Sequence, residues 1–115
     1  MASTLIHTAE CIRTKLDDNR GDVAEIINNE LCGAKDVTSS LRWLEDGQHF
    51  DTASLPGTHQ LIYLIEGNGK ITLEGKDYAL NKGAGVYLGP METAAISQRG
   101  GIPTKFLHII VPIKN

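Results

Sequence analysis

The chain has 115 residues, of which 41% are hydrophobic and 22% are charged, as expected for one globular domain. Its formal net charge is −3 and it has no cluster of Lys or Arg. Nucleic acid and anionic membranes are therefore not expected as partners, because both require a cationic protein face. The longest apolar runs, 61–65 and 106–113, are too short to span a bilayer, and the N-terminus lacks the features of a signal peptide. We expect a cytoplasmic protein.

Short apolar segments alternate with turn residues along the chain. Twelve glycines against four prolines, many of them between these segments, indicate tight turns. We expect strands at 3–7, 23–27, 37–44, 61–65, 70–73, 77–80, 85–88, 93–97 and 104–111. Residues 12–16 fit either a strand or one helical turn, and Gly67-Asn68-Gly69 has the composition of a hairpin turn. Many short strands without a long helix predict an all-β barrel of jelly-roll type, whose open mouth is the expected place of a ligand.

The clearest functional clue is a pattern of spacings between residues 47 and 67. Gly47 is followed after five residues by Ala53, then after one by Leu55, after four by Gln60 and after six by Gly67. This arrangement resembles the first motif of the cupin superfamily, which has Gly, His, His, Glu and Gly at these positions. Both glycines are kept, whereas the three metal-ligand positions are replaced.

A second segment, 83–98, resembles the second cupin motif, which has Gly, Pro, Gly, His and Asn. The residues at these positions are Gly83, Gly89, Met91, Ala94 and Gln98, and Pro90 stands one place late. The resemblance covers 47–111, and residues 1–46 fit as N-terminal strands of the same barrel. It implies that residues 1–115 form a single cupin domain, an all-β jelly-roll β-barrel, and that two copies form a homodimer.

The resemblance carries over a barrel and a pocket, but not a metal centre. The positions that hold three His and one Glu in the family hold Ala53, Leu55, Gln60 and Ala94 here. Transition metals in proteins are bound by imidazole nitrogen or carboxylate oxygen. Ala and Leu offer neither, and a neutral amide is a poor ligand. We therefore expect no metal and no cofactor at the usual cupin site.

Three polar side chains are the candidate catalytic groups: His49, Asp51 and His108. Residues two apart on a strand share a face, so Asp51 is placed to raise the pKa of His49 and to fix its tautomer. The alternative is that both lie in an exposed turn after Gly47. His108 lies in an apolar strand, where it is either a buried histidine with a structural partner or a pocket residue opposite His49.

Strand alternation assigns faces to the neighbours of Gln60. If Gln60 faces the interior, as a former ligand position should, then Ile62 and Leu64 also face inward. His59, Leu61 and Tyr63 then face the other way, toward the outer sheet or a dimer partner. The same alternation, extended back through Leu55 and Ala53, puts His49 and Asp51 on the interior side.

Six residues are candidates for the wall of a substrate pocket: Gln60, Ala53, Leu55, Ala94, Tyr87 and Met91. Four of them occupy the former ligand positions, and two belong to the second motif or stand beside it. Tyr87 would contribute a hydroxyl, although a tyrosine in a sheet is more often a packing residue. Arg42 would bind a carboxylate if its strand turns it inward, and would be solvated otherwise.

Three functions fit these residues. The first is a metal-independent enzyme of the isomerase, lyase or cyclase type, which moves protons on a small organic molecule through acid–base side chains. The second is a non-catalytic protein that binds or senses a small apolar ligand, because Ala and Leu at the ligand positions enlarge and dry the cavity. The third is a cupin with a relocated metal site built from His49, His59 and His108.

Overall fold

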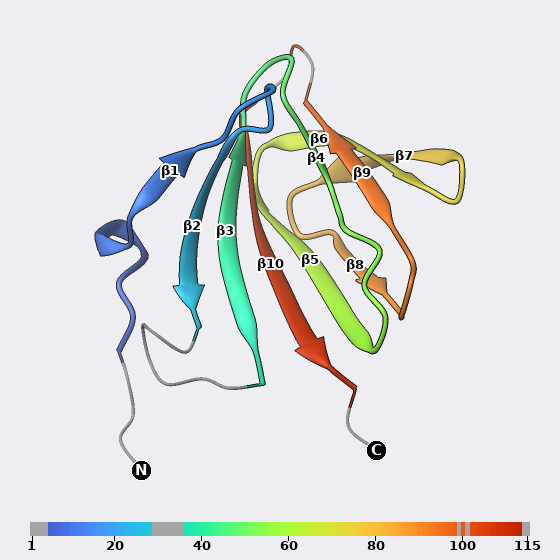
Figure 1. Cartoon of the computed structure of the whole chain (residues 1–115). Helices are drawn as coiled ribbons and strands as arrows, with labels where there is room; N and C mark the ends of the chain where they lie inside the picture. Colours follow the sequence, from blue (N-terminus) through green and yellow to red (C-terminus); the bar gives the residue numbers. More distant parts are fainter. Residues whose placement is uncertain (1–4, 29–35, 99, 101, 114–115) are drawn as a thin grey trace.

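The structure, a computed structural model, describes residues 5–28, 36–98, 100 and 102–113. These residues form one short 3₁₀ helix, η1, and ten strands (Figure 1). The elements are η1 (Thr8–Glu10), β1 (Arg13–Lys15), β2 (Asp22–Ile27), β3 (Thr38–Leu44), β4 (His49–Asp51), β5 (Thr58–Glu66), β6 (Asn68–Leu73), β7 (Lys76–Asn81), β8 (Gly85–Leu88), β9 (Ala94–Ser97) and β10 (Thr104–Pro112).

The strands form two antiparallel sheets (Figure 1). The larger sheet has the order β1-β2-β3-β10-β5-β8, and the smaller has the order β4-β9-β6-β7. The C-terminal strand β10 is central in the larger sheet, where His108 is paired with Ser40 of β3 and with Ile62 of β5. The all-β prediction is confirmed.

Alternate residues of the strands fill the space between the sheets. Ile62 and Leu64 are fully buried, whereas Leu61 and Tyr63 are exposed, as alternation along β5 predicted. The apolar core consists of Leu44, Phe50, Ile62, Leu64, Ile71, Leu80, Leu88, Ala94, Ile96 and Phe106. The next inward residue of β10 after Phe106 is the buried His108. A buried polar side chain therefore follows the apolar core along β10, and this is the place of the candidate site.

The N-terminal prediction was partly wrong. No strand forms at residues 5–7, which precede η1, and residues 3–4 of the predicted strand lie outside the described residues. Residues 12–16 contain β1, so the strand alternative was correct there. No helix within the described ranges has the length and hydrophobicity needed to cross a bilayer.

The predicted hairpin at Gly67-Asn68-Gly69 is instead a corner between the sheets. The strand before it, β5, belongs to the larger sheet, and the strand after it, β6, belongs to the smaller one. Gly67 has φ of 82°, and a Cβ atom there would overlap the carbonyl oxygen of Pro103. Gln98 stabilises the corner by donating from its amide nitrogen to the carbonyl oxygen of Asn68 over 2.5 Å. Glycine is needed here for close backbone packing as well as for its positive φ.

Candidate functional site

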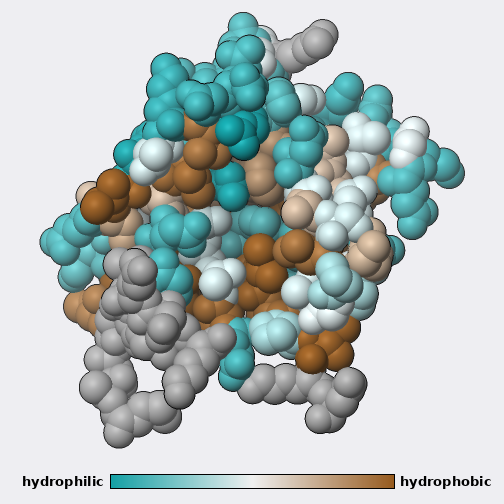
Figure 2. Space-filling model, viewed as in Figure 1, coloured by the Kyte–Doolittle hydropathy of each residue, from teal (hydrophilic) through white to brown (hydrophobic). Residues whose placement is uncertain are grey.

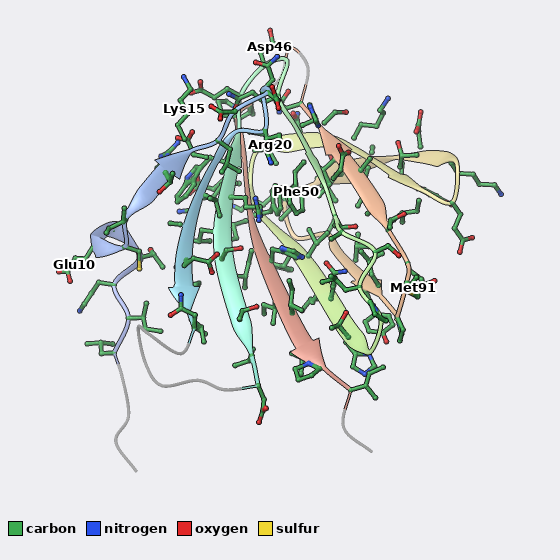
Figure 3. The ribbon with its side chains drawn as sticks, viewed as in Figure 1. Glu10, Lys15, Arg20, Asp46, Phe50 and Met91 are labelled. Atoms are coloured by element: carbon green, nitrogen blue, oxygen red, sulfur yellow. The ribbon has the colours of Figure 1, made fainter. Side chains whose placement is uncertain are left out.

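A cavity of about 380 Å³ opens between the sheets beside His108, and we call it the barrel pocket. Its volume is within the range of small-molecule sites, roughly 300–1,000 Å³. Figure 3 places Phe50 between the sheets with Arg20 above it, and Figure 2 shows hydrophobic and hydrophilic residues side by side on this face. The lining residues are Leu16, Arg20, Val23, Glu25, Arg42, Phe50, Asp51, Ala53, Leu55, Gln60, His108 and Ile110.

His108 is the buried titratable group of the barrel pocket. It lies on β10 with only 5% of its surface exposed. The alternation that buries Phe106 also turns His108 to the interior, where it lines the cavity. Its ring stands nearly edge-on to the ring of Phe50, with 5.3 Å between the centroids. An aromatic neighbour in this geometry holds the imidazole in place and keeps water away from one side.

Gln60 sets the tautomer of His108. The Gln60 amide nitrogen donates to the carbonyl oxygen of Ala53 over 3.1 Å, so its oxygen faces Nε2 of His108 at 2.8 Å. An amide oxygen only accepts, and Nε2 therefore carries the ring proton. In the neutral ring Nδ1 then holds a lone pair, and it has no hydrogen-bond partner among the described residues. Because His108 lines the barrel pocket, this nitrogen is available to accept a hydrogen bond from a molecule that reaches it.

The surroundings of His108 keep it neutral. Its pKa is lowered from 6.5 to about 4, first by burial and second by the nearby positive charge of Arg42. Near pH 7, Nδ1 of His108 is therefore unprotonated in almost every copy of the protein. This is the protonation state required of a hydrogen-bond acceptor or a general base.

Arg42 brings a positive charge into the same pocket. It lies on β3, and its guanidinium carbon is 4.1 Å from the centroid of the Phe50 ring. Its Nε is enclosed and has no hydrogen-bond partner in the described part of the chain. Burial lowers the pKa of Arg42, while the charge of Glu25 acts in the opposite direction. An arginine remains protonated under such shifts, so the pocket contains a partly desolvated cation.

The structure brings three of the predicted wall residues to the pocket. Gln60, Ala53 and Leu55 line it together with His108. Ala94 does not line it, because its side chain is buried in the apolar core beside Thr52, whose hydroxyl accepts a hydrogen bond from the Ala94 backbone. The former metal positions therefore separate into a pocket group and one core residue.

Tyr87 and Met91 lie at a different place. They line a second hollow of about 510 Å³ between the β6–β7 turn and the residues around the β8–β9 loop. Figure 3 shows Met91 away from Phe50, at the loop that precedes β9. Both side chains are more than half exposed, and Nδ1 of His59 lies 2.5 Å from the Tyr87 hydroxyl. This hollow is larger, but Arg42, whose enclosed Nε has no hydrogen-bond partner among the described residues, lines the barrel pocket.

His49 and Asp51 are together, but only Asp51 lines the barrel pocket. Oδ2 of Asp51 is 3.2 Å from Nδ1 of His49, and the side chains are 63% and 42% exposed, respectively. The inward residue of β4 is Phe50, which lies between them and is buried. The inward orientation predicted for His49 is therefore wrong, because the loop between β4 and β5 does not preserve strand alternation.

The former metal positions do not fit a metal ion. Ala53, Leu55 and Ala94 have no donor atoms in their side chains, and both polar atoms of Gln60 already have hydrogen-bond partners. Within the described residues, no group of three or more His, Cys, Asp or Glu side chains could hold a metal ion. The chemistry of these donors gives no basis for deriving a step through a metal.

The relocated metal site is not formed either. His49 contacts Asp51, His59 contacts Tyr87, and only His108 of the three histidines lines the barrel pocket. The prediction of a joint site for these three side chains is therefore wrong, because their strands turn them toward different surroundings.

Sequence reasoning missed several wall residues, of which Phe50 and Glu25 matter most. Phe50 stands between two polar residues, and this short polar–apolar–polar pattern is a signal for an inward phenylalanine. The sequence contains no comparable signal for Glu25 and Val23 on β2. They reach the pocket wall through the pairing of β2 with β3, in which Glu25 is opposite Ser40 and Val23 is opposite Arg42.

Comparisons with known proteins identify the fold. No protein-family model and no curated protein sequence matches the chain. A predicted oxalate decarboxylase from Thermotoga maritima matches with a TM-score of 0.83 and 19% identity, over 96% of this chain and 100% of that one. The polyketide cyclase RemF from Streptomyces resistomycificus matches with a TM-score of 0.75 and 14% identity, over 98% of this chain and 81% of that one. A cupin protein from Bacteroides fragilis matches with a TM-score of 0.68 and 20% identity, over 90% of this chain and 85% of that one.

The chain therefore has the cupin fold over nearly its whole length. Its two antiparallel sheets are those of a jelly-roll-like cupin fold, and the predicted fold is confirmed. Structures that share this fold include small-molecule enzymes, among them a cyclase.

Proposed function

We propose that this protein is a metal-independent enzyme that transfers protons on a small organic molecule, in a reaction of the isomerase, lyase or cyclase type. The observation that carries the proposal is the neutral His108, whose Nε2 is held by Gln60 and whose Nδ1 has no partner among the described residues. The occurrence of a polyketide cyclase on the same fold supports this class of reaction.

His108 acts as the proton acceptor. A proton leaves a substrate atom for Nδ1, the electron pair of the broken bond stays on the substrate, and the ring becomes an imidazolium. As this charge develops, the Nε2–H group donates a stronger hydrogen bond to the Gln60 oxygen. Gln60 is therefore a positioning residue that fixes the ring and its tautomer. The proton then returns to a different substrate atom in an isomerisation, or to a leaving group in an elimination.

Asp51 supplies the second ionisable group of the proposed mechanism. It lines the pocket and contacts His49 at its exposed side. A carboxylate there is placed to exchange protons between substrate and solvent, and His49 holds its orientation. Asp51 is thus the proposed proton relay between substrate and solvent, and His49 acts through it.

A binding protein for a small ligand is the second candidate function. Val23, Ala53, Leu55 and Ile110 give the pocket apolar wall on several sides, which favours a ligand with an apolar body. A binding protein of this kind would bind without turnover, and replacement of His108 would change its affinity but no rate.

Proton transfer can be measured before the substrate is identified. The intact protein is incubated in D₂O with a panel of small organic acids, ketones and lactones, and loss of C–H signals is followed by ¹H NMR. We expect at least one compound whose exchange is slowed roughly 100-fold or more by His108→Gln. Gln60→Leu should slow exchange less and change its pH profile, because it frees the ring tautomer. Exchange at the same rate in wild type and His108→Gln, or binding without exchange, would contradict the proposal.

We also propose that two copies pair through the outer face of the larger sheet. Leu61, Tyr63, Tyr87 and Val111 are between 37% and 59% exposed there. Strand register joins them, because Leu61 is opposite Tyr87 on one side and opposite Ile109 on the other. An apolar surface on three adjacent strands supports association with a second copy.

A further inference from the structure

We infer that the barrel pocket binds the carboxylate group of a small organic anion on the guanidinium of Arg42. This inference names the substrate class of the proposed enzyme and to that extent rests on the proposed function. The binding step itself requires no catalysis, and the two can be tested separately.

The first observation is that Arg42 is partly desolvated and has no ion-pair partner among the described residues. Its enclosed Nε has no acceptor among the described residues, and none of the ion pairs formed by these residues includes Arg42. A buried charge without compensating hydrogen bonds costs free energy, so it is expected to have a partner that is supplied from outside. The fork of a guanidinium matches the two oxygens of a carboxylate.

The second observation is the arrangement of Arg42, Phe50 and His108. The guanidinium carbon is 4.1 Å from the Phe50 ring centroid, and the His108 ring is 5.3 Å from the same centroid. Both polar groups line one cavity and flank one aromatic ring. An anion on Arg42 would therefore hold the rest of the molecule within reach of Nδ1 of His108.

The protein has one internal competitor for this position. Glu25 lines the same pocket and raises the pKa of Arg42 through its charge, but it is not within ion-pair distance. Glu25 on β2 is paired with Ser40, two residues before Arg42 on β3, so it is a diagonal neighbour. If Glu25 were the true partner of Arg42, removing it would leave the site no better for a ligand. If it is a competitor, removing it strengthens anion binding.

The charges around the pocket favour a carboxylate over a phosphate. Arg42 and Arg20 are positive, whereas Glu25 and Asp51 are negative, so the charges of the four residues that line the pocket sum to zero. A single negative charge is balanced by Arg42, but a second would be repelled by the two carboxylates. The apolar wall formed by Leu55 and Ile110 suits the hydrocarbon part of an organic acid.

Binding on Arg42 would also prepare His108 for proton transfer. The positive charge of Arg42 is one of the two causes of the low pKa of His108. A carboxylate on Arg42 offsets that charge and raises the pKa of His108 toward its usual value, which makes Nδ1 a stronger base. The other charged groups that line the same pocket are Glu25 of β2, Asp51 of β4 and Arg20 of the β1–β2 loop.

The test is a titration of the intact protein with benzoate and acetate, with benzamide and acetamide as uncharged controls and inorganic phosphate as a third arm. The readouts are the Arg42 Nε–H resonance and isothermal calorimetry. We expect the carboxylates to bind and the amides and phosphate to bind at least about tenfold more weakly. Arg42→Gln should weaken carboxylate binding by at least about tenfold, Arg42→Lys should weaken it less, and Glu25→Gln should strengthen it. Amide-proton dispersion in the NMR spectrum confirms that each variant is folded.

Equal binding of benzoate and benzamide, or unchanged benzoate affinity in both Arg42 variants, would overturn the inference. Weaker or unchanged benzoate binding in Glu25→Gln would also count against it. Calorimetry separates this inference from the proposed function, because it measures Arg42-dependent benzoate binding without any proton exchange. Arg42-dependent binding without any exchange contradicts only the enzyme, and exchange without Arg42-dependent binding contradicts only the carboxylate site.

Discussion

At the scale of single residues, the proposed chemistry depends on how three side chains share one pocket. His108 is buried and neutral, and Gln60 fixes which nitrogen carries its proton. Arg42 remains charged close by and has no hydrogen-bond acceptor for its enclosed Nε within the described residues. Each of these polar groups on its own would slightly lower the free energy of unfolding, because a buried polar group loses its contacts with water. Together they form an acceptor and a cation beside one cavity, an arrangement typical of ligand sites.

The low pKa of His108 predicts how stability depends on pH. The folded pKa is about 4, whereas the unfolded value is near 6.5, so the unfolded chain binds the proton more tightly between these values. Stability from this group is therefore complete above pH 6.5 and is lost as the pH falls toward 4. Urea unfolding at pH 7 and at pH 4.5 gives the free energy of unfolding at each pH. Between these two values, this free energy should fall by roughly 2 kcal/mol more in the wild type than in His108→Gln. An equal loss in both proteins would show that His108 does not titrate with a lowered pKa.

At the scale of elements, the corner between β5 and β6 holds the two sheets together. Gly67 leads the chain from one sheet to the other and packs against the backbone of Pro103. Behind it, the two N–H groups of the Gln98 amide are shared among the carbonyl oxygens of Asn68 at 2.5 Å and Ile102 at 2.6 Å and the hydroxyl of Thr104 at 2.9 Å. These hydrogen bonds satisfy a buried polar group and fix the start of β10, which carries His108.

A matched pair of glycine substitutions tests the corner. Gly67 and Gly75 have similar positive φ values of 82° and 78°, but no atom lies near a Cβ built on Gly75. Gly75→Ala should cost about 1 kcal/mol, the strain of positive φ alone. Gly67→Ala should cost at least about 3 kcal/mol, because the backbone of Pro103 must also move. Chemical denaturation measures both, and equal costs would show that close packing at the corner is unimportant.

The corner also shows where sequence reasoning about the elements succeeds and fails. Alternation along β5 was predictable, because Gln60, Ile62 and Leu64 alternate with outward residues. The corner was not predictable, since Gly-Asn-Gly suits a hairpin equally well. What distinguishes the two is a contact with Pro103, which is distant in sequence.

The candidate site was only partly predictable for the same reason. Gln60 and His108 were each identified, but their hydrogen bond joins residues 48 positions apart, and no local pattern indicates such a pair. The inward orientation of Arg42 depends on the register of β3. His49 was misplaced because β4 has only three residues and a loop follows it, so alternation could not be carried across.

At the scale of the whole molecule, the sandwich has two different faces. Its interior opens at the barrel pocket, whereas the outer face of the larger sheet presents Leu61, Tyr63 and Tyr87 to the surroundings. The two faces are separated by β10 and β5, so pairing through the outer face would leave the pocket mouth free.

Sedimentation velocity tests the proposed pairing. The wild type should sediment as a dimer, and the double variant Leu61→Lys with Tyr63→Glu should sediment as a monomer, because exposed apolar contact is replaced by charge. Lys70→Glu, a charge change at an exposed position on the other sheet, is the control and should remain dimeric. A monomeric wild type, or a dimeric double variant, would contradict pairing through this face.

The central claim is that His108 presents an unprotonated Nδ1 to the barrel pocket. It is tested most directly by ¹⁵N NMR of the imidazole nitrogens in the intact protein, with His108→Gln used to assign the signals. At pH 7 we expect a protonated Nε2 and an unprotonated Nδ1, and a titration midpoint well below 6.5 that rises when benzoate is added. A ring that is protonated on both nitrogens at pH 7, or that carries its proton on Nδ1, would contradict the claim.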